Sequence, residues 1–247
     1  MNRVIFEKRE IGEDGKAVLP PDDPRFVHMR DILHVEAGCP LKTGELGGLA
    51  GTSVVEKMDA SGATVALRHD TEPPAPWLDM ILALPRPRVY KRLLPQLAAV
   101  GVRRLVLAGA AKTEKAYWGA HWLRDGEARP LLVEGLAQCG ATVPPVIFQE
   151  RNFARFVRSG GLERMFGGQP VRYVAHPGKA AGAPNAVSAS GPAPVLAIGP
   201  EGGWTDEEVG MLEEAGFERL ALGPRILRTD TAAMALAGIL MHFRFAA

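Results

Sequence analysis

Two stretches of the sequence have the residue types of a ligand-binding loop at the end of a strand. LAIGPEGGWTDEE begins at Leu196, and LALGPRILRTDTA begins at Leu220. Each has an apolar run, a Gly-Pro pair, an insert, and then Thr-Asp. Gly199 and Gly223 allow backbone conformations that other residues resist, and a proline after each stops strand pairing. The pattern predicts two strand-to-helix turns, the position at which parallel α/β sheets bind ligands.

The first insert reads EGGW, and its glycines indicate a close approach of a ligand. Gly202 and Gly203 carry no side chains, so we expect the ligand to lie on their backbone. Glu201 is either a turn-exposed carboxylate or a catalytic or ligand-binding group. Thr205, followed three residues later by Glu208, is typical of a capping box at a helix start.

The second insert reads RILR and places a cation just before a helix. The helix dipole disfavours positive charge there by about 0.3–1 kcal/mol, so a functional role for Arg228 is favoured over a structural one. Ile226 and Leu227 are either core plugs or the floor for a flat ligand. One of residues 229–231 is expected to cap the last helix. If the two strands are neighbours, their loops form two walls of one crevice.

Several nucleotide-binding and hydrolytic sites are excluded by missing motifs. The sequence has no G-x-x-x-x-G-K-[ST], no G-x-G-x-x-G after a strand, and no G-x-S-x-G. The six histidines are scattered, and Cys39 and Cys139 lie far apart, so we predict no metal site and no disulfide.

The composition is that of a globular protein, with 47% hydrophobic and 23% charged residues among 247. No apolar run reaches the length of about eighteen residues that a membrane span needs, and the N-terminus lacks a secretory signal, so we expect a cytoplasmic protein. Residues 1–72 carry a net charge of −4 and residues 73–247 of +5, so a polyanion would be attracted by the second part. The densest basic cluster, RPRVYKR at residues 86–92, is either part of that surface or a solvated helix face.

The first seventy residues read as a small β-module. The runs NRVIFEKRE, TSVVEKM and ATVALRHD are of β-type, and turn signals occur at EDGK, LKTGELGG and DASG. One helix is predicted at Pro24 to Val35. The proline-rich TEPPAPW, residues 71–77, is a predicted linker. We therefore expect domains at 1–72 and 73–247.

After the linker, strands and helices alternate. Predicted strands are LDMILAL, RLVLAGA, PVIFQ and VRYVAHP. Predicted helices are RVYKRLLPQLAAVGV, two stretches around Lys115–Leu123 and Ala128–Gly140, and NFARFVRSGGLERMF as one helix. GKAAGAPNAVSASGPAP is expected to be a flexible connection. Alternation with continuously apolar strands predicts an α/β fold with a mostly parallel sheet covered on both faces.

The C-terminal part resembles a known family. LAIGPEGGWTDEEVGMLEEAGFERLALGPRILRTDTAAMAL is similar to the signature of the RsmE family of 16S ribosomal RNA (uracil-N3) methyltransferases, in the SPOUT superfamily. IGPEGG, LGPRILRT and their separation occur together, and AHPG precedes them where the family has a similar loop. The resemblance covers the whole chain.

The resemblance implies a trefoil-knotted parallel-sheet domain with a small PUA-like RNA-binding β-barrel before it. It further implies a homodimer and an S-adenosylmethionine site, with knot and site in about residues 172–247. The implied cofactor-binding residues are His176, Pro177, Gly178, Ile198, Gly199, Gly202, Gly203, Leu222, Gly223, Ile226, Leu227 and Thr231.

The resemblance also implies the reaction, which is methyl transfer to N3 of a uridine in 16S ribosomal RNA, as naked RNA or in the small ribosomal subunit. Glu201 is the candidate base for the N3 proton, and Arg228 the candidate for stabilising charge on the uracil oxygens or for holding a phosphate. The candidates for RNA binding are Arg86, Arg88, Lys91, Arg92, Arg25 and Arg30.

The chain departs from the family pattern in its RNA-facing parts. In ILHVEAGC, the residues His34, Glu36 and Cys39 replace two basic residues and an acid. PQLAAVG lacks a Lys and a Glu of the family, and AQCGA has Ala137 and Ala141 in place of a Glu and an Arg. Three alternatives therefore stay open, namely ribose 2′-O-methylation by another SPOUT enzyme, an inactive RNA-binding relative, and an α/β enzyme for a small metabolite.

Overall fold

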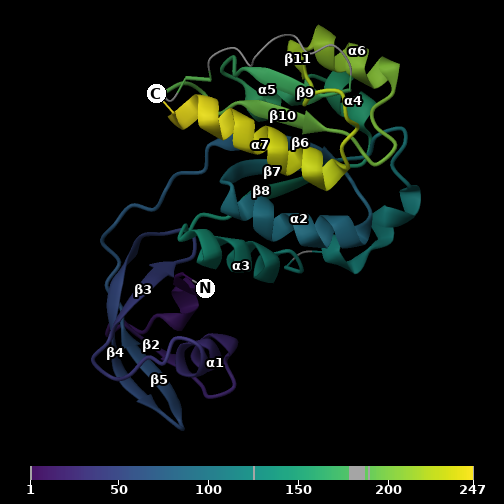
Figure 1. Cartoon of the computed structure of the whole chain (residues 1–247). Coiled ribbons are helices and arrows are strands. Elements are labelled where there is room, and N and C mark those ends of the chain that lie inside the picture. Colours follow the sequence, from purple (N-terminus) through teal and green to yellow (C-terminus); the bar gives the residue numbers. More distant parts are fainter. Residues whose placement is uncertain (1, 125, 178–186, 189, 247) are drawn as a thin grey trace. The chain divides into compact units, whose positions relative to one another are not determined.

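The computed structural model of the chain describes residues 2–124, 126–177, 187–188 and 190–246 (Figure 1). The chain forms two compact units. The first comprises the chain up to Ala75 together with Leu132–Pro144, and the second comprises Pro76–Leu131 and the chain from Pro145 onwards. Within the described ranges, no helix is both long and apolar enough to span a membrane.

The first unit is built on a five-stranded sheet in the order β1-β3-β4-β5-β2. Its strands are β1 (Val4–Phe6), β2 (Lys16–Leu19), β3 (Pro40–Glu45), β4 (Ala50–Asp59) and β5 (Gly62–Ala66). β1 and β3 pair in parallel and the other pairs are antiparallel. The short turn η1 (Lys8–Glu10), helix α1 (Pro24–Asp31) and most of helix α3 (Arg129–Cys139) complete the unit. Phe26 and Met29 of α1 pack against Phe6, Leu19 and Val55 of the sheet.

The sequence predictions for this unit need two corrections. LKTGELGG is not a turn throughout, because its first residues belong to strand β3. Gly44 lies in this strand and packs closely against Thr142, because a Cβ atom on Gly44 would lie 2.5 Å from Cγ2 of Thr142. Helix α1 ends at Asp31, before the predicted end at Val35, and His34 has a φ of 49°, which an α-helix does not contain.

The second unit contains a six-stranded sheet in which every pair of strands is parallel, as predicted. The strand order is β11-β9-β10-β6-β7-β8. The strands are β6 (Leu78–Ala83), β7 (Val102–Ala108), β8 (Val146–Glu150), β9 (Arg172–Ala175), β10 (Val195–Ile198) and β11 (Phe217–Leu220). All residues of β6 and β10 are buried, because helices cover both faces of the sheet.

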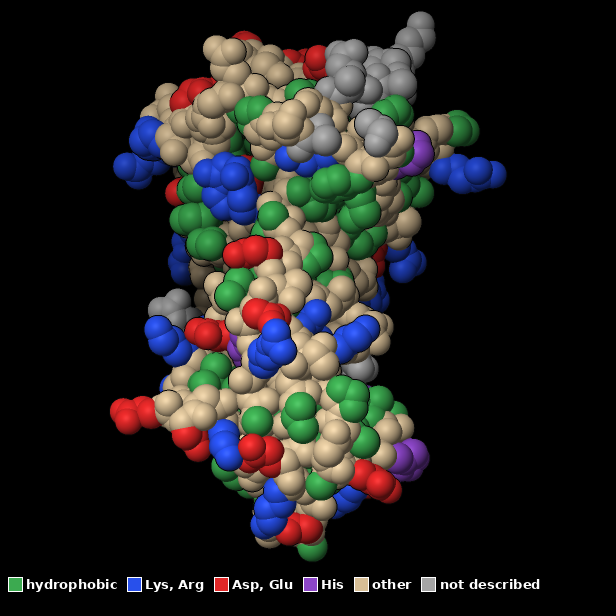
Figure 2. All heavy atoms as spheres, turned by 90° about the vertical axis from the view of Figure 1, so that its left-hand side faces the viewer, with side chains coloured by type: hydrophobic (Ala, Val, Ile, Leu, Met, Phe, Trp, Pro, Cys, Tyr) green, Lys and Arg blue, Asp and Glu red, His purple; other side chains and the backbone are tan. Residues whose placement is uncertain are grey.

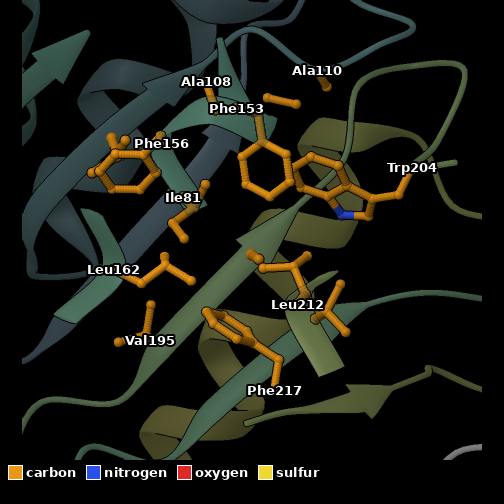
Figure 3. Packing of buried hydrophobic residues seen from close by; sticks show 14 of the residues in the cluster. Ile81, Ala108, Ala110, Phe153, Phe156, Leu162, Val195, Trp204, Leu212 and Phe217 are labelled. Atoms are coloured by element: carbon orange, nitrogen blue, oxygen red, sulfur yellow. The ribbon is translucent and has the colours of Figure 1, made fainter. Parts of the chain in front are cut away.

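Two groups of helices cover the sheet (Figure 1). The first group is α4 (Phe153–Arg158), α5 (Gly161–Phe166) and α6 (Asp206–Glu214), and the second is α2 (Pro87–Ala99) and α7 (Thr229–Phe245). Figure 3 shows the core beneath the first group, where Phe153, Phe156, Leu162 and Leu212 surround Ile81 of the central strand β6. Helix α7 contacts β10 and α2 contacts β7.

Two helix predictions in this unit are wrong in detail. NFARFVRSGGLERMF forms two helices, because Gly160 adopts a φ of 73° between α4 and α5. The stretch around Lys115–Leu123 forms two short 3₁₀ turns, η2 (Lys115–Gly119) and η3 (His121–Leu123), instead of an α-helix. Most of the predicted flexible connection, residues 178–186 and 189, lies outside the described residues.

A buried carboxylate organises the amino ends of strands β6 and β7. Asp79 is fully buried, and its oxygens accept hydrogen bonds from Arg103 at 3.0 and 2.6 Å and from Arg104 at 3.0 and 2.6 Å. The two guanidinium groups keep part of their surface in water, so they can be solvated without Asp79. The charge of Asp79 is therefore compensated only by the two arginines, whereas water can compensate part of the charge of each arginine.

We expect Asp79→Asn to lower the free energy of unfolding by about 1–3 kcal/mol, because charge-assisted hydrogen bonds at a buried site are lost. Urea denaturation measures the change. Asp70→Asn, at an exposed ion pair with Arg68, is the matched control and should change stability by less than about 0.5 kcal/mol. Equal effects of the two substitutions would contradict this account of Asp79.

Candidate functional site

A pocket of about 460 Å³ lies where strands β9, β10 and β11 end. Three strand-end loops line it, at 175–177, 198–204 and 220–227. Helix α7 contributes Thr229, Ala232 and Leu236, and Lys112 comes from the loop after β7. Gly203 and Leu227 thus face the same pocket. The prediction that the two Gly-Pro loops line one crevice is confirmed.

The sequence predicts one crevice if the strands before the two loops are neighbours. These strands, β10 and β11, are not neighbours. Strand β9 lies between β10 and β11 and pairs with both. The loop that follows β9, with His176 and Pro177, therefore enters the pocket between the two Gly-Pro loops. A strand inserted between two consecutive strands is a long-range feature that hydrophobic periodicity does not report.

Most residues expected to bind a cofactor lie in the pocket wall. These residues are His176, Pro177, Ile198, Gly199, Gly202, Gly203, Leu222, Gly223, Ile226 and Leu227. Glu201 lines the pocket as well. Among the predicted site residues that the structure describes, Arg228 and Thr231 do not line the pocket. Both are next to lining residues in the sequence, and both are exposed. Gly178 lies outside the described residues.

The glycines of the first loop serve different purposes. Gly203 has a φ of 69°, and its N–H donates to the carbonyl of Pro200 at 2.8 Å, which closes a tight turn. Gly199 is not in the left-handed region, contrary to the expectation of an unusual backbone there. A Cβ atom on Gly199 would instead lie 3.0 Å from the backbone nitrogen of Trp204, so a close approach requires glycine.

Lys112 occupies the space that the sequence analysis assigned to a ligand over Gly202. A Cβ atom on Gly202 would lie 3.1 Å from Cδ of Lys112. The Lys112 ammonium group donates to the carbonyl of Gly202 at 2.9 Å and is 3.4 Å from the carbonyl of Trp204. The missing side chain at Gly202 thus makes room for Lys112. The sequence gives no local signal for this contact, because ninety residues separate the partners.

Glu208 fixes the other end of the same loop. The predicted capping box is confirmed, with the Thr205 N–H donating to Oε2 of Glu208 at 2.9 Å and the Glu208 N–H donating to the Thr205 hydroxyl at 3.2 Å. The second carboxylate oxygen, Oε1, accepts the N–H of Ala111 at 2.7 Å. Glu208 is buried, so these bonds lie away from water and hold the loop around Ala111 beside helix α6.

Glu201 is exposed at the edge of the pocket and has a specific backbone partner. Its Oε1 accepts the N–H of Arg86 at 2.9 Å. Arg86 is the N-cap residue of helix α2, where the helix dipole favours a negative charge. Glu201 is therefore positioned by the start of α2. The candidate base and the start of the basic cluster are in direct contact.

The start of helix α7 differs from the prediction that one of residues 229–231 is its N-cap. The N-cap residue is Arg228, and among the described residues it has no side-chain capping bond. Thr229 lies within the first turn, and its buried hydroxyl donates to the carbonyl of Gly199 at 3.3 Å. Thr229 thus connects the second Gly-Pro loop to the first.

Asp230 supplies the negative charge at this helix start. It forms an ion pair with Arg92 of α2 and accepts the N–H of Thr231 at 3.0 Å. Burial raises the pKa of Asp230, but the hydrogen bonds from Arg92 and from the Thr231 N–H, together with the charge of Arg92, outweigh burial and hold the pKa below its ordinary value. Arg92, a candidate for RNA binding, is therefore engaged within the second unit.

The other candidates for RNA binding differ in their surroundings. In the second unit, Arg86 and Arg88 have exposed side chains, and the ammonium group of Lys91 lies 4.4 Å from the ring centre of Trp122. In the first unit, Arg25 pairs with Glu10 and Asp23, and Arg30 pairs with Asp31. The shortest nitrogen–oxygen distances in these pairs are 2.6, 2.7 and 2.6 Å.

The lining suits a ligand that has an apolar part and several hydrogen-bonding groups. Leu222, Leu227 and Leu236 supply apolar surface, while the loops supply backbone groups. Two buried nitrogens of the lining, Nδ1 of His176 and Nε1 of Trp204, have no hydrogen-bond partner among the described residues. Buried polar atoms normally have partners, and both of these atoms belong to residues of the pocket wall. The described residues contain no group of three His, Cys, Asp or Glu side chains that could hold a metal ion.

A family of RNA methyltransferase domains matches residues 71–241, which include both Gly-Pro loops and most of helix α7. The chain belongs to this RNA methyltransferase family. The match begins within the predicted linker and takes in every strand of the parallel sheet.

Relatives extend the similarity to the whole chain. The ribosomal RNA small subunit methyltransferase E of Treponema pallidum is 27% identical, over 98% of this chain and 91% of its own length. A Neisseria gonorrhoeae ribosomal RNA small subunit methyltransferase E, solved bound to S-adenosyl methionine, has a TM-score of 0.70 at 22% identity, covering 98% of this chain and 97% of its own. A probable rRNA-methyltransferase from Porphyromonas gingivalis has a TM-score of 0.72 at 20% identity, covering 98% and 99%. At these identities the two structures establish a shared fold.

We expect Lys112→Ala to loosen the first Gly-Pro loop, because its bonds to two loop carbonyls are lost. Amide hydrogen exchange of residues 200–205, read by mass spectrometry, should speed up by about fivefold for a lost hydrogen bond of about 1 kcal/mol. Lys115→Ala removes an exposed lysine three residues away and is the control. If exchange in the loop is the same in both variants, Lys112 does not hold the loop.

Proposed function

We propose that the chain is an S-adenosylmethionine-dependent methyltransferase that modifies N3 of a specific uridine in the 16S ribosomal RNA of the small ribosomal subunit. The observation that carries the proposal is the pocket formed by both Gly-Pro loops at the carboxyl edge of the sheet, in a chain of the RNA methyltransferase family. The names of the relatives support ribosomal RNA of the small subunit as the substrate.

The pocket fits the methyl donor by the chemistry of its lining. Leu222, Leu227 and Leu236 offer apolar surface for a purine, and the loop backbone offers hydrogen bonds for its edge and for the ribose. These residues would hold S-adenosylmethionine. Its positively charged sulfur would make the methyl group easy to transfer, because the sulfur leaves as a neutral thioether.

The chain's own residues would handle the proton and the charge of the nucleobase. N3 of uracil carries a proton, which must leave as the new bond to the methyl carbon forms. Glu201, at the pocket edge, accepts this proton on its carboxylate. Arg228 offsets the negative charge that spreads onto the uracil carbonyl oxygens. The bond from the Arg86 N–H to Glu201 keeps the carboxylate in place.

The resemblance supports a finer description of the architecture. In this proposal the second unit is a SPOUT-type trefoil knot, and the first is a PUA-like module that contributes RNA contacts. The functional domains are then residues 1–72 and 73–247, and the enzyme acts as a homodimer. Arg228 is exposed beside the pocket and outside its lining, so in this scheme it acts from the rim.

Incubation of the full chain with labelled S-adenosylmethionine and small ribosomal subunits, or their naked RNA, tests the proposal. The subunits should come from a strain that lacks the gene. We expect label in 16S RNA and, by mass spectrometry of nucleosides, 3-methyluridine. A ribose-methylated nucleoside would instead identify a 2′-O-methyltransferase, and the absence of donor binding in calorimetry would overturn the proposal.

Glu201→Gln separates proton transfer from positioning. The amide oxygen of Gln can still accept the Arg86 N–H, but the side chain no longer takes up a proton. If Glu201 is the base, kcat should fall by about 10²-fold or more while the donor Kd stays within about twofold. Single-turnover transfer to 16S RNA and calorimetry measure the two quantities. A variant as fast as the native protein would assign Glu201 to positioning alone.

Arg228→Ala tests the role of the cation at the start of helix α7. We expect donor affinity within a few-fold of the native value, because Arg228 is outside the pocket lining, and methyl transfer reduced by about 10²-fold. Arg225→Ala removes a nearby exposed cation that does line the pocket and serves for comparison. Unchanged turnover of Arg228→Ala would remove this residue from the mechanism.

A further inference from the structure

The segment KAYWGAHWLR, residues 115–124, gathers aromatic side chains at the surface of the second unit. It holds Tyr117, Trp118 and Trp122, and the whole chain has four tryptophans and three tyrosines. The segment forms the 3₁₀ turns η2 and η3, in which every residue is half-buried or exposed. Large rings usually contribute to a core, so their collection on a surface turn indicates contact with a partner.

Each of the three rings has a cation from another element beside it. The ammonium group of Lys91 lies 4.4 Å from the ring centre of Trp122. The guanidinium carbon of Arg151 lies 5.5 Å from the ring centre of Trp118. Arg86 and Glu114 lie near the hydroxyl of Tyr117, whose pKa is raised by burial and by Glu114 and lowered in part by Arg86. These contacts orient the rings and place positive charge among them.

A hollow of about 550 Å³ adjoins the segment on the side of the pocket. Trp118, Lys115 and Arg151 line it, and so does Thr113, whose hydroxyl has no hydrogen-bond partner among the described residues. The stretch at residues 111–113 borders both the hollow and the pocket. Ala111 and Thr113 line the hollow, while Lys112 between them lines the pocket.

Arg86 lies between the segment and the candidate base. Its N–H bonds to Glu201 at the pocket edge, and its side chain is near enough to Tyr117 to lower the pKa of the Tyr117 hydroxyl. Glu208 in turn holds the loop at Ala111, from which the segment continues. The segment therefore starts three residues after Lys112 of the pocket wall, and nucleotides that flank a target base in the pocket would lie beside it.

We infer that residues 115–124, which we call the aromatic shelf, bind unpaired nucleotides next to the target base of the RNA. This inference rests on the proposed function. Stacking on aromatic rings beside cations is how proteins hold single-stranded RNA, and a base in a duplex cannot offer its face in this way. On the face of the protein shown in Figure 2, basic and acidic side chains are interspersed.

Fluorescence anisotropy with the full chain tests the aromatic shelf. The probes are a labelled, unstructured, uridine-rich ribo-oligonucleotide and a blunt RNA duplex of the same length. We expect Trp118→Ala and Trp122→Ala each to weaken binding of the single strand by about tenfold, with the duplex affected by less than about twofold. Trp118→Phe and Trp122→Phe retain a stacking face and should recover most of the affinity.

Arg219→Gln is the control for a change elsewhere on the unit, since Arg219 is an exposed residue paired with Glu213 on helix α6. It should leave binding of both probes unchanged. Thermal unfolding checks that every variant is folded, and calorimetry with S-adenosylmethionine should give the native Kd for all of them.

The outcomes distinguish the two proposals. If the donor binds and 16S RNA is methylated, but the alanine variants bind the single strand as the native chain does, the aromatic shelf is refuted and the proposed function stands. Equal weakening for single strand and duplex would also refute it, because stacking would not be the cause. If the native chain neither binds the donor nor transfers a methyl group, the proposed function fails, whatever the oligonucleotides show.

Discussion

The buried carboxylate of Glu208 is the interaction on which the arrangement of the site depends. One oxygen accepts the backbone N–H of Thr205 and the other accepts that of Ala111. The bond to Thr205 ends the first Gly-Pro loop, and the bond to Ala111 fixes the loop after β7. Because the carboxylate is away from water, losing either partner would leave a costly unpaired group. The pocket wall and the approach to the aromatic shelf therefore both depend on this side chain.

The pocket is built by backbone, yet distant side chains determine the shape of that backbone. Lys112 bonds to carbonyls of the first loop, Thr229 connects that loop to the start of helix α7, and Glu201 connects it to the start of α2. Loops held by several elements lose little conformational freedom when a ligand binds, which favours affinity. The glycines permit this arrangement in two ways, through a left-handed turn at Gly203 and a close approach at Gly202.

Local pattern in the sequence was enough for the features that depend on neighbouring residues. It gave the parallel sheet, the two Gly-Pro turns and the capping box from Thr205 to Glu208. It did not give the insertion of β9 between β10 and β11 or the contact of Lys112 with Gly202, because these join residues far apart in the chain. It predicted a helix around residues 115–123, where the structure has two 3₁₀ turns, because a short helical pattern does not distinguish an α-helix from 3₁₀ turns.

Trp204 belongs at once to the hydrophobic core and to the pocket wall. Its ring packs against Phe153 with 4.9 Å between ring centres, and the same residue lines the pocket (Figure 3). A core that is close-packed transmits small changes in volume to its edges. Mutations that repack the interior near Phe153 will therefore also reshape the cavity that receives the ligand.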